Sequence, residues 1–349
     1  MLRITLRHTL SAFLLLLCAG AGLSMLPGTA AQAATLLDSI KARGTLHCGV
    51  SEGIPGFSLA DKGRWQGLDV DYCRALASAL LGSPDAVRYI PLNATERFDA
   101  LRAGRIDVLA RNSTWTIGRE AEFGIAFAGV LFFDGQGFLT RRENGARYAL
   151  ELSGAKVCVK PATTTARNLE NYFTLNAMQY TLIPVEDFEG MKKAFEEGSC
   201  DVVTSDQSQL FALRSGLQDP SSARVLPEFI SKEPLAPAVA AFDADWLLLA
   251  RLVLAVLVNA EEMGIDSRNV GQIAGIAKSV PVRGLLDLDG RFADHLGLQP
   301  GWAPLMLESV GNYGEVFARN LGKGSVLGLK RGQNALWKHG GLLYAPRID

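Results

Sequence analysis

Strand-like stretches alternate with amphipathic helical stretches twice along this chain, and that alternation restricts the fold to an α/β class. Strands are expected at 45–53, 86–93 and 106–112, then at 154–160, 179–186 and 200–206. Helices are expected between them, at 68–82, 94–105 and 187–199 and directly after the loop at 160–165. Strand–helix–strand repeats of this kind favour mainly parallel sheets that helices cover on both faces.

Two extended stretches, interrupted by glycine or proline, separate these sets at 129–143 and 221–240. The order predicts two α/β lobes joined by two crossings, with the second lobe inserted into the first. Lobe 1 is expected over 34–137 and 235–349, including a C-terminal extension whose remainder is helical, and lobe 2 over 138–234. Lobes with a double connection can close on a ligand by bending at the hinge.

Residues 1–33 have the layout of a secretory signal peptide. Arg3 and Arg7 precede a short apolar run, and small residues fit cleavage near Ala33. The run is shorter than the roughly 20 residues of a spanning helix, and the leucine before Cys18 disfavours a lipoprotein site. A soluble, monomeric protein of the periplasm is therefore expected.

Charge and residue spacing exclude several classes of partner. The formal net charge is −1 at pH 7, and the predicted signal peptide removes two arginines and no acid. No nucleic-acid partner is expected, because the chain has no excess of basic residues. The four histidines are scattered and no CxxC spacing occurs, so neither a metal nor a cofactor is expected. The apolar stretch 246–260, which Arg251 interrupts, is expected to be a buried helix.

Four cysteines remain once Cys18 is removed. In an oxidising compartment an even number indicates disulfide bonds, and three pairings are possible. The first two lie in the first α/β set and the last two in the second, so pairing within each set is favoured. The expected bonds are Cys48–Cys73 and Cys158–Cys200.

Polar loops follow four of the expected strands. They read "CGVSEG", "LARNST", "VKPATTT" and "VVTSDQ". Ligands of open α/β sheets gather at the carboxyl ends of strands, so these loops are expected to form one binding site.

Motifs around those loops resemble the family 3 periplasmic solute-binding proteins, the polar amino acid receptors of ABC importers. "GLDVDYCRALA" resembles the family's glycine–acid–acid motif, and "LDSIKARGTLHCGV" resembles its lead into the first strand. Further motifs resemble those of the general L-amino acid-binding subfamily. They are "ARNSTWT", "FFDGQGF", "ISKEPLAP", "VGNYGEVF" and "NALW…GGLLYAP". The resemblance spans nearly the whole mature chain. It implies a two-lobe, type II periplasmic binding protein fold with a ligand cleft and two hinge crossings.

The same resemblance implies how a ligand's α-carboxylate is held. The family's arginine matches Arg119, with Asn112 and Thr114 nearby, and a threonine of the second lobe matches Thr164, beside Thr163. A guanidinium meets a carboxylate bidentately, more strongly than a neutral donor does. Either threonine could instead cap the helix that follows.

The family's aspartate for the α-ammonium matches Asp206, which could otherwise cap its own following helix. Arg111 stands where many relatives carry serine, next to the loop that contains Ser51 and Glu52. Arg111 is expected to recognise acidic or polar side chains or to pair with Glu52. Such a pair would leave an adaptable pocket for many amino acids.

The expected function is a non-catalytic receptor that delivers L-amino acids to the permease subunits of an ABC transporter in the inner membrane. The alternative is a periplasmic enzyme resembling cyclohexadienyl dehydratases on the same fold. That enzyme needs a placed general acid, and only Glu52 and Asp206 are candidates. A sensor domain is disfavoured because no membrane-spanning stretch follows residue 260.

Overall fold

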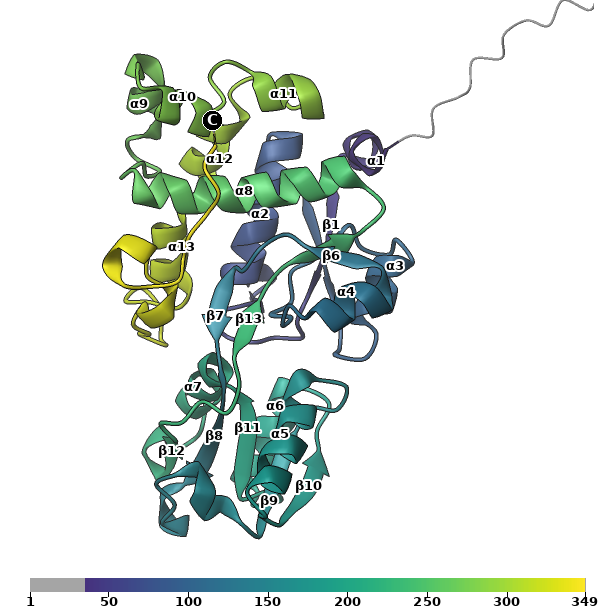
Figure 1. Ribbon diagram of the computed structural model, residues 1–349, viewed down its shortest axis with the longest axis vertical. Coiled ribbons are helices and arrows are strands. Elements are labelled where there is room, and N and C mark those ends of the chain that lie inside the picture. Colours follow the sequence, from purple (N-terminus) through teal and green to yellow (C-terminus); the bar gives the residue numbers. More distant parts are fainter. Residues whose placement is uncertain (1–34, 349) are drawn as a thin grey trace, which may run out of the picture. The chain divides into compact units, whose positions relative to one another are not determined.

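The structure is a computed structural model that describes residues 35–348. The predicted signal peptide, with Cys18 and Ala33, lies outside the described residues. Two five-stranded sheets, each flanked by helices, make up the fold, and two extended segments of chain run between them (Figure 1).

The first sheet has the strand order β4-β1-β5-β14-β6. Its strands are β4 (Val87–Pro91), β1 (Leu46–Val50), β5 (Val108–Leu109), β14 (Ala238–Ala240) and β6 (Ile125–Phe127). β1 pairs in parallel with β4 and β5, whereas β14 runs antiparallel to β5 and β6. The helices around it are α1 (Leu36–Arg43), α2 (Leu68–Leu81), α3 (Arg97–Arg102), α4 (Ile117–Phe123) and α8 (Ala244–Glu262).

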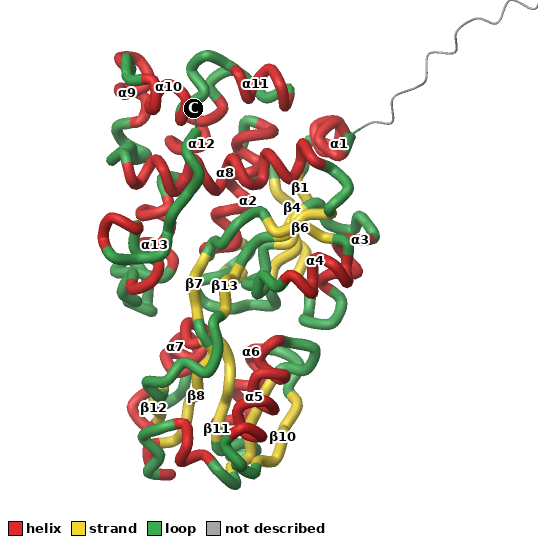
Figure 2. Tube along the Cα trace, viewed as in Figure 1, coloured by secondary structure: helices red, strands yellow, loops and turns green. Residues whose placement is uncertain are grey.

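The second sheet repeats this order as β10-β9-β11-β8-β12. Its strands are β10 (Tyr180–Pro184), β9 (Ala155–Val159), β11 (Val202–Asp206), β8 (Gln136–Arg141) and β12 (Ala223–Val225). β9 is parallel to β10 and β11, and β8 is antiparallel to β11 and β12. The helices α5 (Thr164–Leu175), α6 (Phe188–Glu196) and α7 (Gln207–Ser215) pack against it (Figure 2).

The two segments between the sheets contain β7 (Phe132–Asp134) and β13 (Glu233–Leu235), which pair antiparallel. β7 leads into β8 of the second sheet, and β13 leads into β14 of the first. Each segment therefore supplies the antiparallel fourth strand of the sheet that it enters. A hairpin of β2 (Leu59–Asp61) and β3 (Arg64–Gln66) completes the strands.

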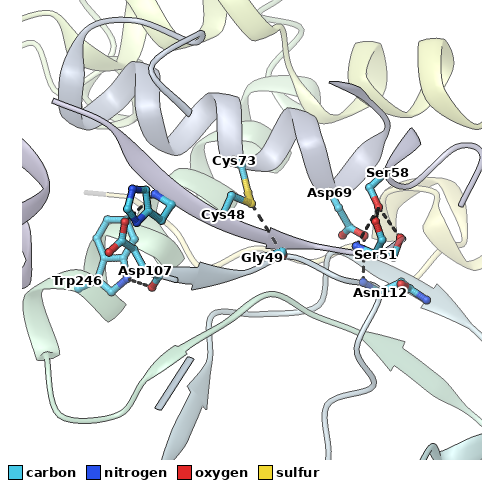
Figure 3. The surroundings of a disulfide bond; sticks show 10 residues. Cys48, Gly49, Ser51, Ser58, Asp69, Cys73, Asp107, Asn112 and Trp246 are labelled. Carbon is cyan, nitrogen blue, oxygen red and sulfur yellow. Dashed lines mark hydrogen bonds between the residues drawn. A yellow bond between two sulfur atoms is a disulfide. The ribbon is translucent and has the colours of Figure 1, made fainter. Parts of the chain in front are cut away.

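Helix α8 is the buried helix that the apolar stretch predicted. Trp246 is fully buried, and its indole N–H donates to the backbone oxygen of Asp107 at 2.8 Å, beside the first sheet (Figure 3). No helix among residues 35–348 is long and apolar enough to cross a membrane.

Five further helices follow α8. They are α9 (Val270–Ile276), α10 (Val280–Leu285), α11 (Arg291–Leu296), α12 (Trp302–Val310) and α13 (Tyr313–Asn320). After Asn320 the expectation of helix is wrong, because the chain to residue 348 forms only two short 3₁₀ turns. Repeated glycines in this segment, including Gly322 and Gly324, oppose a helix.

This C-terminal segment holds the β7 crossing. The Asn334 side chain accepts a hydrogen bond from the Phe133 N–H at 2.7 Å and donates one to the Phe133 carbonyl at 2.9 Å. The Tyr313 hydroxyl donates to the backbone oxygen of Leu131 at 2.7 Å. The Arg331 guanidinium pairs with Glu261 of α8 at 2.8 Å, which fixes the segment to the first lobe.

Both expected disulfide bonds are confirmed. Cys48 of β1 is bonded to Cys73 of α2 (Figure 3), and Cys158 of β9 is bonded to Cys200 beside β11. The Cα–Cα distances are 6.3 and 5.7 Å. All four side chains are fully buried. Each bond links a strand of one sheet to a neighbouring segment of the same lobe.

Removing either bond should destabilise the protein while leaving the cleft between the lobes intact. The bonds span 25 and 42 residues, for which loop-closure entropy gives about 3.5 and about 4 kcal/mol. We expect Cys48→Ala/Cys73→Ala and Cys158→Ala/Cys200→Ala to lower the free energy of unfolding by these amounts in urea titrations. Equal stability of either double variant and the wild type would contradict this.

Candidate ligand-binding site

One polar cavity lies between the two lobes, where the carboxyl ends of the central strands of both sheets meet. The space between its lining side chains, including solvent at its mouth, is about 450 Å³. From the first lobe it is lined by Ala94, Arg97, Arg111, Asn112, Ser113, Thr114 and Arg119. From the second it is lined by Lys160, Thr163, Thr164, Thr165, Met191, Thr204, Ser205, Asp206 and Gln209.

The structure brings seven of the nine expected ligand-binding residues to this cavity. The two that do not line it are Ser51 and Glu52. Ser51 is buried, and its hydroxyl is hydrogen-bonded to that of Ser58. Glu52 is exposed and is not within ion-pair distance of Arg111 in the described chain, although its charge is the strongest one that acts on the Arg111 guanidinium. Arg111 instead donates from Nε to the Leu92 carbonyl at 2.7 Å.

The loop after β5 is fixed in place from two directions. Asn112 has the positive φ of 37°, and its backbone N–H donates to the buried Asp69 carboxyl of α2 at 3.0 Å (Figure 3). The backbone N–H of Trp115 donates to the Pro234 carbonyl at 2.8 Å, so the loop runs along β13. Thr114 is thereby held between the cavity and the crossing strand.

Arginine side chains from three elements converge on the first-lobe side. Arg119 stands in the first turn of α4, and its guanidinium donates to the Thr114 carbonyl at 2.5 Å. Arg97 begins α3 and is 3% exposed, and its Nε–H has no hydrogen-bond partner. Burial, reinforced by the charges of Arg111 and Arg119, holds the pKa of Arg97 well below the usual value for arginine.

On the second-lobe side, the N-terminus of α5 faces the cavity. Thr163 is the N-cap, because its hydroxyl accepts from the Ala166 N–H at 3.2 Å. The expected alternative of a cap therefore holds for Thr163. The backbone N–H groups of Thr164 and Thr165 have no hydrogen-bond partner inside the helix. They form part of the positive end of the helix dipole, which attracts anions. Nearby, burial lowers the pKa of Lys160 to about 8.

Asp206, at the end of β11, is the single carboxyl group that lines the cavity in the described part of the chain. It is 5% exposed and accepts a hydrogen bond from the Gln209 amide at 2.5 Å. It does not cap α7 with its side chain. Burial, with the charges of Asp134 and Glu233, raises the pKa of Asp206 well above its ordinary value.

The pattern of charges favours an anionic group in the cavity. Four cationic side chains line it, those of Arg97, Arg111, Arg119 and Lys160, against the one carboxyl of Asp206. Burial lowers the pKa of each of the four. A carboxylate bound among them would restore part of the lost solvation and offer bidentate partners.

Sequence reasoning missed four residues here: Arg97, Lys160, Asp134 and Glu233. Lys160 and Glu233 lie within the motifs "VKPATTT" and "ISKEPLAP", so their charges and their places in these motifs could have indicated a role at the site. Arg97 opens an ordinary amphipathic helix, and no spacing distinguishes it from a solvated arginine.

The buried carboxyl group of Asp69 makes the stability of the folded protein depend on pH. Burial raises its pKa from 3.8 to about 7, so the folded chain binds this proton more tightly than the unfolded chain. Its contribution to stability is full below pH 3.8 and is lost as the pH rises to about 7, on the order of 4 kcal/mol.

Asp69→Asn keeps an oxygen to accept from the Asn112 N–H but cannot ionise. We expect urea titrations between pH 4 and 7 to show a smaller fall in unfolding free energy for this variant than for the wild type. Asp61→Asn, at an exposed acid, is the control and should follow the wild type. Parallel pH profiles for Asp69→Asn and the wild type would contradict the prediction.

Comparison with known proteins agrees with this geometry. Residues 46–212 match the model of the bacterial extracellular solute-binding proteins, family 3. The general L-amino acid-binding periplasmic protein AapJ of Rhizobium johnstonii is 45% identical over 337 residues, covering 95% of this chain and 98% of AapJ. The glutamate/glutamine/aspartate/asparagine-binding protein BztA of Rhodobacter capsulatus is 44% identical over 318 residues, covering 90% and 94%.

A solved structure of similar sequence shows the same architecture. It is an ABC transporter periplasmic binding protein from Brucella ovis with glutathione bound, 44% identical, with a TM-score of 0.87. The match covers 90% of this chain and 100% of that one. The expected two-lobe, type II fold is confirmed by this likeness together with the two paired sheets. The chain belongs to the family 3 bacterial extracellular solute-binding proteins.

Proposed function

We propose that this protein is a non-catalytic, extracytoplasmic receptor that binds L-amino acids in the cleft and delivers them to the permease of an ABC importer. One observation carries the proposal: the cavity between the lobes brings arginine side chains and a helix N-terminus together with one buried carboxyl group. Arg119 and the N-terminus of α5 suit the carboxylate, and Asp206 suits the ammonium. The similarity to AapJ and BztA, which are named as amino acid-binding proteins, supports it.

The two charged groups of an amino acid would connect the lobes. Arg119 belongs to the first lobe, whereas Asp206 and the N-terminus of α5 belong to the second. A ligand that contacts both lobes stabilises the arrangement in which they meet, by its differential contacts with that arrangement. This is the property that a receptor needs in order to present a loaded state to a membrane partner.

The remaining cations favour side chains that carry oxygen acceptors. Once Arg119 is assigned to the α-carboxylate, Arg97, Arg111 and Lys160 still line the cavity. Acidic and amide side chains suit these donors best. BztA, which is named for glutamate, glutamine, aspartate and asparagine, agrees with this preference. A broad receptor with its highest affinity for these four is the form of the proposal that the charges support.

A second candidate ligand is a small peptide with an amino acid head. A cavity of about 1430 Å³, counting open solvent, adjoins the first and shares Arg119 and Thr164 with it. It extends beyond the first cavity, and Arg167, Glu122 and Glu170 add charges of both signs to its lining. The Brucella ovis relative with glutathione bound supports including such ligands.

Catalysis of the dehydratase type is disfavoured by the same cavity. A general acid must reach the leaving group, and Asp206 is the one lining carboxyl group among the described residues. In the proposal Asp206 is used for the ammonium. Turnover of prephenate or arogenate by the purified protein would reverse this assignment.

A thermal-shift screen of the mature protein against the twenty L-amino acids, glutathione and prephenate tests the proposal. Ligands that bind the folded state raise the midpoint of unfolding. We expect shifts with many amino acids, largest for the acidic and amide ones. In Arg119→Gln all shifts should vanish, because affinity for the shared carboxylate falls by about 100-fold or more.

Arg97→Gln is the matched variant, since it removes a cation of the same cavity from the side-chain end. It should weaken glutamate and aspartate selectively and leave small neutral amino acids unchanged. No shift with any amino acid, in protein unfolded and refolded to remove bound ligand, would sink the receptor proposal. If Arg97→Gln weakened all amino acids equally and Arg119→Gln weakened only the acidic ones, Arg97 would hold the α-carboxylate and Arg119 the ligand side chain.

The raised pKa of Asp206 predicts that binding depends on pH. In the empty site the carboxyl holds its proton to a higher pH than usual, and a ligand ammonium favours the ionised form. Binding therefore releases a proton, and affinity weakens as the pH falls below the raised pKa, by about tenfold per unit. Calorimetry in buffers of different ionisation enthalpy measures that proton.

Asp206→Asn should bind about 2–5 kcal/mol more weakly at high pH and lose the pH slope. A variant that keeps both its affinity and its pH dependence would show that another group accepts the ammonium.

A further inference from the structure

Glu233 is a buried carboxylate at the start of β13 that lies behind the cavity. It is 1% exposed and does not line the cavity itself. Its Oε2 accepts from the Thr114 hydroxyl at 2.5 Å and from the Thr164 hydroxyl at 3.0 Å. Its Oε1 accepts from the Asn168 amide at 2.8 Å and the Ser231 hydroxyl at 2.5 Å. One carboxylate thus receives four donors from both lobes and the crossing.

Thr114 and Thr164 are the two members of this network that line the cavity, one from each lobe. Their hydroxyl oxygens are 3.2 Å apart. A hydroxyl has one proton to donate and two lone pairs to accept with. A carboxylate is the strongest acceptor within reach, so both protons point to Glu233. Both oxygens can then only accept hydrogen bonds from a ligand.

We infer that Glu233 is a positioning residue that fixes Thr114 and Thr164 as acceptors and so makes the cleft select a ligand with a donor at that point. This rests on the proposed function. An α-ammonium satisfies the two oxygens, whereas the carbonyl of the matching 2-oxo acid faces them with lone pairs. The ligand carboxylate is then left to Arg119 and the backbone N–H groups of α5, in place of the threonine hydroxyls.

Glu233→Gln should reverse the direction of both hydroxyls without a change of side-chain volume. The amide oxygen can still accept from Asn168 and Ser231, which places the NH₂ group against the two threonines. Its two N–H bonds then donate to Thr114 and Thr164. The hydroxyl protons are released to turn into the cavity, where they can donate to a carbonyl.

The experiment compares L-glutamate with 2-oxoglutarate by calorimetry at pH 8 for the wild type and three variants. In Glu233→Gln we expect the preference for L-glutamate over 2-oxoglutarate to fall by about tenfold or more. Ser231→Ala removes a donor to the far oxygen of Glu233 alone and should keep the wild-type ratio. Thr114→Val, which lacks the acceptor, should weaken L-glutamate and leave 2-oxoglutarate unchanged.

An unchanged ratio in Glu233→Gln, even with both affinities lowered, would show that Glu233 only supports the fold and would overturn the inference. If Glu233→Gln does not fold, Thr114→Val decides the question: equal weakening of both ligands would also overturn it. Failure of the wild type to bind any amino acid would remove the proposed function first, and this inference with it. These results are distinguishable from one another.

Discussion

The antiparallel pairing of β7 with β13 places the buried carboxyl group of Glu233 beside that of Asp134, which is partly exposed. Asp134 is directly opposite Glu233 in the register, an arrangement in which like charges repel. Burial, and to a lesser degree the charge of Glu233, raises the pKa of Asp134 to about 6. Donors from the second lobe make the pair tenable, since the Ser208 hydroxyl and N–H both bond to Asp134. Both lobes thus supply hydrogen-bond donors to the acids of the crossings, Thr114 from the first lobe and Thr164 and Ser208 from the second.

The cavity between the lobes, in contrast, carries an excess of positive charge. Four cations whose pKa values burial lowers face a single lining carboxyl. Glu52 and Asp69 of the first lobe offset part of the charge of Arg111, and Asp206 offsets part of the charge of Lys160. In the proposed function a zwitterionic ligand supplies a carboxylate to the remaining cations and an ammonium to Asp206.

The strand–helix alternation, both disulfide bonds and the convergence of the four loops could be predicted, because each follows from local periodicity or from the compartment. Arg97 could not be found, since its role depends on where α3 meets a second lobe built from residues far along the chain. Glu233 stood in a quoted motif, yet its partners Thr114 and Asn168 are distant in sequence. The C-terminal segment does not form the expected helix after Asn320, because glycines such as Gly322 and Gly324 oppose it.

The grip of Asn334 on both backbone groups of Phe133 has a mechanical consequence. It ties the first part of β7 to the first lobe, so this crossing is held by that lobe up to the residue before Asp134. Gly135 has no room for a side chain there, since a Cβ would come within 2.3 Å of the Phe229 ring. The same Cβ would lie 2.9 Å from the Ser231 carbonyl oxygen on the other crossing. Glycine at this position therefore lets the two crossings approach each other closely where they enter the second lobe.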